Sequence, residues 1–317
     1  MSPFVSILIP CYNAERWIAE AIESALAQTW SLKEVVVVDD GSTDRSLEII
    51  QRFDGRIRWE TGPNRGGNAA RNRLLELANG EWLQYLDADD YLLPEKVACQ
   101  VNALQQHPDS DVIYSPTAWK RVENGVIVCN ETPIPEPRDA WILLALWRLP
   151  QTGGALWKKA TLRRVGGWRI GQPCCQEHEL YCRLLEDNAR FRYCAGCHAV
   201  YRDTEQSGRV TRRLGGEFER QRLQILERIE TQLTSSLALT SARRQAINDA
   251  RHELARRLWE GNRPLADTVL ERILASDRFF RPSTAPASPP LYQLAFWLLG
   301  FKGAQLAASC TRSLRIR

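Results

Sequence analysis

The stretch Glu81-Trp82-Leu83-Gln84-Tyr85-Leu86-Asp87-Ala88-Asp89-Asp90 decides how this chain is interpreted. Its first half has the apolar character of a buried strand, and Leu93-Pro94-Glu95-Lys96 after it is typical of a helix start. Its second half holds three carboxylates within four residues, where like charges raise one another's pKa. Mg²⁺ or Mn²⁺ would remove that cost, because these cations bind carboxylates together with substrate phosphates. The stretch therefore predicts a metal–diphosphate site, although for an acidic triplet alone a helix-capping loop is the better interpretation.

The composition is ordinary for a soluble globular protein, with 44% hydrophobic and 25% charged residues in a chain of 317. A net charge of +4 is too small to indicate a nucleic-acid partner. The nine cysteines are scattered through expected strands and helices, which suits reduced thiols better than a disulfide framework. The N-terminus lacks the features of a signal peptide, and no run of about 18 uncharged apolar residues occurs. We therefore expect a cytoplasmic protein.

Strands and helices are predicted to alternate along the first two thirds of the chain. The expected strands lie at 4–10, 34–38, 57–60, 81–85, 111–115, 120–122, 126–128, 153–158, 191–194 and 198–201. Such alternation predicts an α/β fold with a mainly parallel sheet and helices on both faces. Ligands of these sheets bind beyond the carboxyl ends of the strands. Because residues 10–12, 39–40 and 87–89 all follow predicted strands, we expect them to meet in one crevice.

Only helices are predicted after about residue 215. Their apolar stripes run at helical spacing through Phe218, Leu223, Leu226, Ile229, Leu233 and Leu237, through Ile247, Leu254 and Leu258, and through Leu265, Val269, Ile273 and Leu274. This pattern predicts an α/β domain at 1–210, a helical region at 211–280 that could mediate homo-oligomers, and a proline-rich linker at 281–290. The remainder, 291–317, is predicted to form an amphipathic basic helix. This helix either lies peripherally on the inner surface of an anionic membrane or packs back on the helical region.

Five motifs resemble glycosyltransferase family two in their order and approximate spacing. They are VSILIPCYN (5–13), VVVVDDGSTD (35–44), NRGGNAARN (64–72), ANGEWLQYLDADD (78–90) and TGGALWKKATLRRVGGW (152–168). The resemblance covers residues 4–205 and implies a GT-A fold, a Rossmann-like sheet sandwiched by helices. It also implies an inverting, metal-dependent hexosyltransferase of polysaccharide biosynthesis. The donor would be a nucleotide-diphosphate sugar, with UDP favoured, and the acceptor a glycan, a lipid-linked molecule or a protein.

The resemblance assigns the base end of the donor site to the first two strands. Pro10 and Tyr12 would line the base pocket, with Tyr12 offering an aromatic surface. Asp40 would accept hydrogen bonds from the base edge, and Asp44 would add a polar contact. Turn and helix-cap chemistry is the competing interpretation for both carboxylates, and for Asp44 it stands level with binding.

The diphosphate end is assigned to the acidic stretch and to one arginine. Arg71 would contact the nucleotide portion, since a guanidinium suits a diphosphate. Asp87 would contact the ribose, or the metal through water, with Ala88 beside it in the donor site. Asp89 would be the direct ligand of Mn²⁺ or Mg²⁺. Asp90 is expected to belong to the start of the following helix or to the residues that support the direct metal ligand.

An inverting transferase also needs a general base, which the family places in a Glu-Asp pair that opens a helix. Gln176-Glu177 takes that position here, so the pattern is altered. Glu177 is the favoured base, and the neighbouring His178 is the alternative because it titrates near neutrality. The altered pair also motivates a second hypothesis, a non-catalytic nucleotide-sugar-binding or scaffolding protein.

Two further motifs lie between residues 194 and 209. Arg202 and Arg209 flank a polar segment that resembles the family's loop over the diphosphate, and both are candidate clamps. Residues 194–198 match the CxxCH pattern of c-type haem attachment, but the context argues against haem, because no export signal is expected and the segment lies between two short predicted strands. A zinc site lacks the usual second CxxC pair and is a minor alternative; its ligands would be Cys174, Cys175, Cys194, Cys197 and His198.

Overall fold

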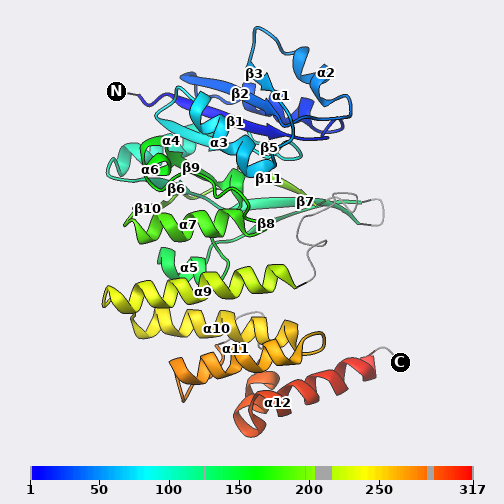
Figure 1. Ribbon diagram of the computed structural model, residues 1–317, viewed down its shortest axis with the longest axis vertical. Coiled ribbons are helices and arrows are strands. Elements are labelled where there is room, and N and C mark those ends of the chain that lie inside the picture. Colours follow the sequence, from blue (N-terminus) through cyan, green and yellow to red (C-terminus); the bar gives the residue numbers. More distant parts are fainter. Residues whose placement is uncertain are drawn as a thin grey trace. The chain divides into compact units, whose positions relative to one another are not determined.

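A computed structural model describes residues 2–123, 126–136, 138–196, 198–203, 216–283 and 289–315 of the chain (Figure 1). The chain forms two compact units. One consists of Met1–Ala140 and Arg148–Gly215, and the other of Trp141–Trp147 and Gly216–Arg317. Within the described ranges, no helix combines the length and the apolar content that crossing a bilayer requires.

The first unit is built on a seven-stranded sheet with the order β10-β6-β9-β4-β1-β2-β3. Its strands are β1 Val5–Cys11, β2 Lys33–Asp39, β3 Arg58–Thr61, β4 Trp82–Tyr85, β6 Val112–Tyr114, β9 Ala155–Lys158 and β10 Phe191–Tyr193. All neighbours pair in parallel except β9, which is antiparallel to both β4 and β6. The predicted α/β class with a mainly parallel sheet is confirmed.

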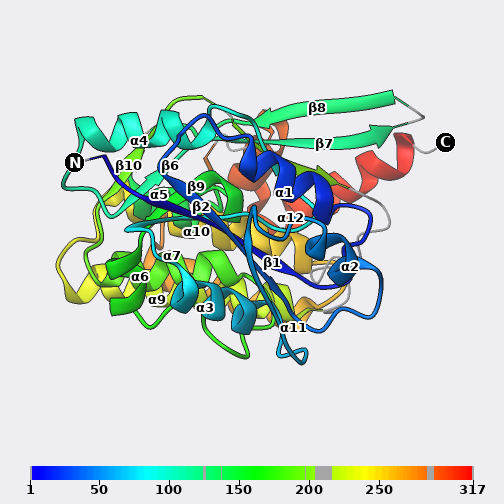
Figure 2. The same ribbon diagram turned by 90° about the horizontal axis from the view of Figure 1, so that it is seen from above.

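Helices cover both faces of this sheet, as Figure 2 shows for α1 and α3 on either side of β1. They are α1 Ile18–Leu26, α2 Ser46–Gln51, α3 Gly67–Leu77, α4 Lys96–Gln106, α6 Lys159–Arg164 and α7 Gln176–Glu186. Ile7 and Ile9 of β1 share a core cluster with α1 and α4, whereas Leu8 is buried on the opposite face. This two-sided burial explains why β1 is apolar throughout instead of alternating.

A second, four-stranded sheet has the order β5-β11-β7-β8. Its strands are β5 Tyr91–Leu92, β7 Thr117–Glu123, β8 Val126–Thr132 and β11 Ala199–Asp203. The predicted hairpin of β7 and β8 is present, but the sequence did not predict that β5 and β11 join it. Because β5 begins directly after Asp90, this sheet holds the far end of the acidic stretch in place.

The second unit consists of helices. They are α5 Ala140–Ala145, almost all of which lies in this unit, and α9 Glu217–Ser235, α10 Ser241–Leu258, α11 Arg263–Ser276 and α12 Pro290–Arg315. Gly300, with φ of 67°, interrupts the helical geometry of α12 and produces a kink. Two residues of the predicted stripes are misassigned. Leu237 lies beyond the end of α9 and is 95% exposed, and Leu274 of α11 is 58% exposed.

Candidate active site

The acidic stretch leaves the carboxyl end of β4 and is fixed at its last residue. Asp90 is buried, and its Oδ1 accepts a hydrogen bond from the backbone N–H of Arg202 at 2.9 Å. Burial, with the nearby charges of Asp89 and Asp87, raises the pKa of Asp90 well above the usual range. Asp90 therefore ties the stretch to β11.

Arg71 and Asp87 form an ion pair next to the stretch. Nη2 of Arg71 lies 2.7 Å from Oδ1 of Asp87, and the guanidinium lies over the ring of Trp168 at 4.9 Å from its centroid. The arginine side chain is only 13% exposed. Although burial opposes its charge, the carboxylates of Asp87 and Glu177 raise the pKa of Arg71. One guanidinium thus interacts with the acidic stretch and with the candidate base.

The carboxylate of Glu177 is oriented by a hydrogen bond from a threonine. Oε1 of this half-buried glutamate accepts a hydrogen bond of 2.6 Å from Oγ1 of Thr152, in the short 3₁₀ helix η1 (Thr152–Gly154). Glu177 lies in the first turn of α7, after Cys175 in the left-handed conformation with φ of 60°. The structure therefore brings Arg71, Asp87 and Glu177 together, although 106 residues separate the first from the last in sequence.

His178 occupies a different environment from its neighbour. Its ring is buried and meets the ring of Tyr181 edge-on, with centroids 6.2 Å apart. Tyr181 in turn stacks on Trp157 at 4.9 Å, within a group of aromatic rings. His178 therefore packs into the aromatic interior beneath α7, whereas Glu177 remains partly accessible.

The segments that follow β1 and β2 provide an accessible aromatic ring and two carboxylates, of Asp40 and Asp44, that accept hydrogen bonds from the backbone. Tyr12 follows β1 and is 50% exposed, and Pro10 before it is half-buried. Asp40 is buried, and its two carboxylate oxygens accept hydrogen bonds from the N–H groups of Arg65 (2.9 Å) and Gly66 (2.8 Å), in the turn before α3. This carboxylate therefore ties the end of β2 to the helix that carries the site arginine.

Asp44 makes contacts of the same kind. Its carboxylate accepts hydrogen bonds from the backbone N–H groups of Glu15 at 3.0 Å and Ser46 at 2.9 Å. Although partial burial opposes it, these hydrogen bonds lower the pKa of Asp44. The carboxylate thereby joins the loops that follow β1 and β2.

Asp89 is half-buried between Asp87 and Asp90, and Ala88 is buried beside it. Among the residues that the structure describes, no group of three or more His, Cys, Asp or Glu side chains is placed so that it could hold a metal ion by itself. A Mg²⁺ or Mn²⁺ site of one or two carboxylates completed by substrate phosphates does not need such a cluster. The oxygen donors present suit these hard cations.

Arg202 is buried against α1. Its guanidinium lies between the rings of Trp17 and Tyr91, 4.7 and 4.9 Å from their centroids, and forms an ion pair with Glu20. The other candidate clamp, Arg209, lies outside the described residues, as does Cys197 of the CxxCH motif.

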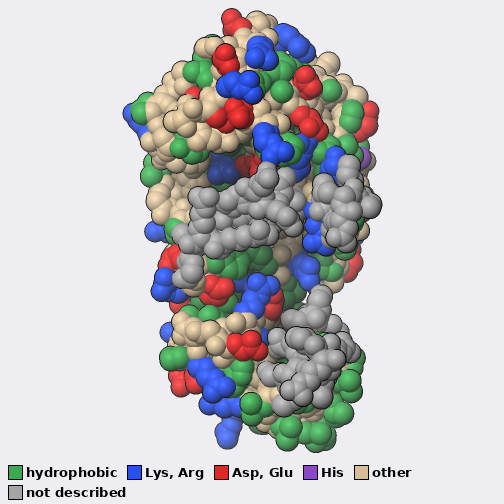
Figure 3. Space-filling model, turned by 90° about the vertical axis from the view of Figure 1, so that its right-hand side faces the viewer, with side chains coloured by type: hydrophobic (Ala, Val, Ile, Leu, Met, Phe, Trp, Pro, Cys, Tyr) green, Lys and Arg blue, Asp and Glu red, His purple; other side chains and the backbone are tan. Residues whose placement is uncertain are grey.

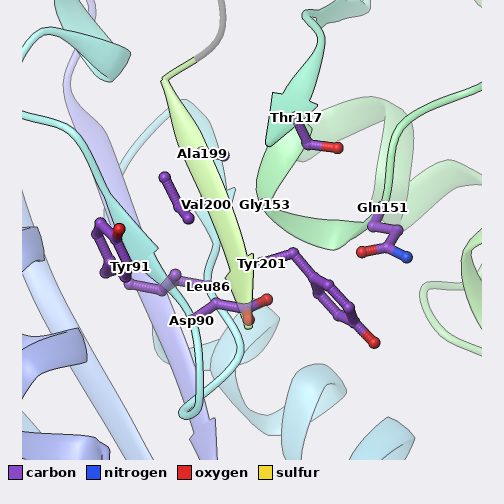
Figure 4. A pocket seen from close by; sticks show the side chains of 9 residues that line it. All are labelled: Leu86, Asp90, Tyr91, Thr117, Gln151, Gly153, Ala199, Val200 and Tyr201. Carbon is purple, nitrogen blue, oxygen red and sulfur yellow. The ribbon is translucent and has the colours of Figure 1, made fainter. Parts of the chain in front are cut away.

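A small pocket opens where the two sheets of the first unit meet (Figure 4). It is lined by Leu86, Asp90, Tyr91, Thr117, Gln151, Gly153, Ala199, Val200 and Tyr201. Figure 4 shows the Asp90 carboxylate near the start of the Tyr201 side chain, whose ring extends to the lower right, with Thr117 and Gln151 in the upper right of the view. Thr117 and Gln151 have no counterpart among the sequence-predicted site residues, because neither belongs to a recognisable motif.

The family model described as "Glycosyl transferase family 2" matches residues 6–164. That range is half of the chain and contains the acidic stretch, Arg71 and Thr152. The chain is a family 2 glycosyltransferase. The resemblance drawn from the five sequence motifs is thereby confirmed.

Relatives of this glycosyltransferase match over part of their length. An uncharacterized glycosyltransferase of Haemophilus influenzae is 40% identical over 109 residues, which cover 33% of this chain and 44% of that protein. Glycosyltransferase GlyG of Streptococcus pneumoniae is 36% identical over 117 residues, covering 36% and 38%. A chondroitin synthase of Pasteurella multocida is 43% identical over 98 residues, covering 30% and 10%. The alignments thus span less than half of each relative.

Solved structures of similar fold cover much more of this glycosyltransferase. Residues 1–349 of Staphylococcus aureus TarS in complex with UDP-GlcNAc match 87% of this chain and 89% of that chain, with a TM-score of 0.56 and 20% identity. The mannosyltransferase PcManGT of Pyrobaculum calidifontis, in complex with GDP-Man and Mn²⁺, matches 99% and 88% with a TM-score of 0.54 and 18% identity. These likenesses establish the GT-A fold.

A buried network of polar side chains that the sequence did not reveal is hydrogen-bonded to the backbone of η1. Nζ of Lys96 contacts the side-chain oxygens of Gln84 and Gln100. The amide groups of these glutamines donate to the carbonyls of Gly153 (3.1 Å) and Gly154 (3.0 Å). Burial lowers the pKa of Lys96 to about 7. The network fixes the η1 backbone, and with it the threonine that holds the candidate base.

Proposed function

We propose that this chain transfers a sugar, with inversion, from a nucleoside-diphosphate donor to a hydroxyl group of an acceptor. A UDP-sugar is the first choice of donor, and the acceptor is a glycan, a lipid-linked molecule or a protein. The observation that carries the proposal is the cluster of Arg71, Asp87 and Glu177 beyond the carboxyl ends of the strands. It combines a cation for a diphosphate with a carboxylate for an acceptor.

The nucleoside would bind between the ends of β1 and β2. Tyr12 offers an exposed ring for stacking on the base, and Pro10 would shape the pocket beside it. Each oxygen of Asp40 accepts one backbone hydrogen bond and retains a second acceptor site, through which it would meet the base edge. Asp44, engaged by two backbone N–H groups, would act by keeping these loops in place.

The diphosphate would lie next to the acidic stretch. Nε of Arg71 is buried and has no hydrogen-bond partner among the described residues, so a donor group is left for a ligand oxygen. Asp87, oriented by the same arginine, would contact the ribose, and Ala88 would form the floor of this end of the site. Asp89 would hold Mn²⁺ or Mg²⁺. When bound, such a cation neutralises charge on the leaving diphosphate.

Glu177 would be the general base. Thr152 holds Oε1, and Oε2 can take the proton of the acceptor hydroxyl. The acceptor oxygen would then bond to the anomeric carbon, and the bond from that carbon to the diphosphate oxygen would break with its electron pair going to the diphosphate. His178 is the less suitable base, because its ring packs in the aromatic interior.

Two further parts of the proposal concern the clamp and the cellular location. Arg202 would act through its backbone hydrogen bond to Asp90, since its side chain is committed to Glu20 and two rings, and Arg209 would contact the diphosphate directly. We also propose a cytoplasmic location. It is supported by the free thiols of the cysteines that the structure describes.

The test is a donor panel of UDP-, GDP- and dTDP-sugars, assayed for binding and turnover with and without Mn²⁺. The E177Q variant should bind the donor as wild type does and lose at least about 100-fold in turnover. The D89A variant should lose metal-dependent donor binding. Donor binding without turnover by the wild type would favour the non-catalytic alternative that the altered Gln176-Glu177 pair suggests, and turnover by E177Q at the wild-type rate would refute Glu177 as the base.

A further inference from the structure

The first half of α12 exposes a continuous apolar stripe. Its large side chains are between 53% and 83% exposed: Leu291, Leu294, Trp297, Leu298 and Leu299. Spacings of three and four residues place Leu291, Leu294 and Leu298 on one side of the helix. Figure 3 shows hydrophobic side chains gathered at the lower end of the view, over the part of the surface that belongs to α12. Exposed apolar surface of this extent marks an interaction site.

The opposite side of the same helix is firmly packed. The hydroxyl of Tyr292 lies 3.2 Å from Nε2 of His252 and accepts a hydrogen bond of 2.9 Å from Nε2 of Gln305. The rings of Phe296 and Phe301 meet His252 at centroid distances of 5.4 and 5.6 Å. The helix is therefore anchored in the second unit, and its exposed stripe is not the consequence of a helix that fails to pack.

The sequence around the stripe carries charge of one sign only. Between positions 278 and 317 there are six basic residues and no Asp or Glu: Arg278, Arg281, Lys302, Arg312, Arg315 and Arg317. Lys302 faces Asp267 of α11 at 3.3 Å, but both side chains are largely exposed, so this pair offsets little of the charge. Two copies of this segment would repel each other, whereas an anionic surface would attract it.

We propose that α12 binds the surface of a membrane that contains anionic lipids. The stripe would enter the boundary between headgroups and acyl chains, where Trp297 is the kind of side chain that such an interface favours. The basic residues would attract the anionic headgroups. The kink at Gly300 lets the apolar first half and the arginine-bearing end of the helix adopt separate orientations. This inference does not depend on the proposed sugar transfer.

The experiment is co-sedimentation of the full chain with vesicles of phosphatidylcholine alone, or of phosphatidylcholine mixed with phosphatidylglycerol. We expect binding to the mixed vesicles and little binding to the neutral ones. The variant W297E/L298E should lower the partition coefficient at least about ten-fold, because two carboxylates replace apolar side chains that would enter the membrane interface. The control L237E adds a carboxylate at a leucine of the same unit that is even more exposed and lies outside α12, and it should bind as wild type does.

The arginines are tested separately. R312Q/R315Q/R317Q should weaken binding to the mixed vesicles by about 100-fold, since each basic residue near the surface contributes about five-fold. D89A should bind vesicles as wild type does, which separates membrane binding from donor binding. Equal binding to both kinds of vesicle would refute the proposed attraction between the basic residues and the anionic headgroups. Absence of vesicle binding, together with a dimer in light scattering that W297E/L298E dissociates, would overturn the proposal in favour of self-association.

Discussion

Lys96 gives the sharpest quantitative expectation for this protein. Its ammonium group is enclosed in the first unit, where it donates hydrogen bonds to the side-chain oxygens of Gln84 and Gln100, and burial lowers its pKa from 10.5 to about 7. Below pH 7 both the native and the unfolded chain hold the proton, so the full cost of burying the charge is present. Between pH 7 and 10.5 the native lysine releases its proton while the unfolded one keeps it. The free energy of unfolding therefore rises with pH across this window.

The size of this rise in the free energy of unfolding follows from the lowered pKa of Lys96. One proton of difference between the two states changes the free energy of unfolding by about 1.4 kcal/mol per pH unit, which amounts to about 2.5 kcal/mol between about pH 7.5 and about pH 9.5. The K96M variant keeps an unbranched side chain and removes the ionisable group, so it should lack this rise. Its cost is the loss of hydrogen bonds to Gln84 and Gln100, which leaves two buried oxygens to find other donors.

The measurement is urea unfolding of wild type and K96M at the two pH values, followed by tryptophan fluorescence. The difference between the two proteins is the relevant quantity, because Cys11 and Tyr114, whose pKa values burial raises to about 12, lower the stability of both proteins at high pH. The control K302M removes an exposed lysine and should leave the pH dependence unchanged. An identical pH dependence in wild type and K96M would refute the buried neutral lysine.

Three further expectations follow from the described contacts. T152V should lower kcat about ten-fold with little change in donor KM, and T152S should restore it, because the hydroxyl orients Glu177; equal losses in both variants would indicate a packing effect instead. R71K should weaken donor binding at least about ten-fold, whereas R73K, at an exposed arginine of the same helix, should not, as isothermal titration with UDP would show. Burial lowers the pKa of His252 to about 3, so the unfolded chain binds a proton that the native chain does not and the free energy of unfolding falls as pH drops below 6.5. H252Q should remove about 2.7 kcal/mol of this loss near pH 4.5 in urea unfolding, and an unchanged acid dependence would contradict a buried neutral imidazole.

The sequence by itself determined the fold class and the family. The apolar run of β1, the alternation of strands with helices, and the position of Asp87 and Asp89 after β4 depend on patterns within a few residues, which local periodicity reveals. Arg71 and Glu177 were also identified from their motifs. The rule that ligands bind beyond the carboxyl ends of parallel strands predicted a common crevice for residues 10–12, 39–40 and 87–89, but it did not predict that Arg71 and Glu177 lie near Asp87.

Only the tertiary structure decided what each of these side chains contacts. The hydrogen bond from Thr152 to Glu177, the attachment of Asp90 to β11 and the enclosure of Lys96 join segments far apart in the chain, and no local pattern encodes such partners. The same holds for α12, whose sequence is apolar on several sides. Packing of Tyr292 against His252 determines which side is buried, and therefore which side exposes Trp297 to a partner.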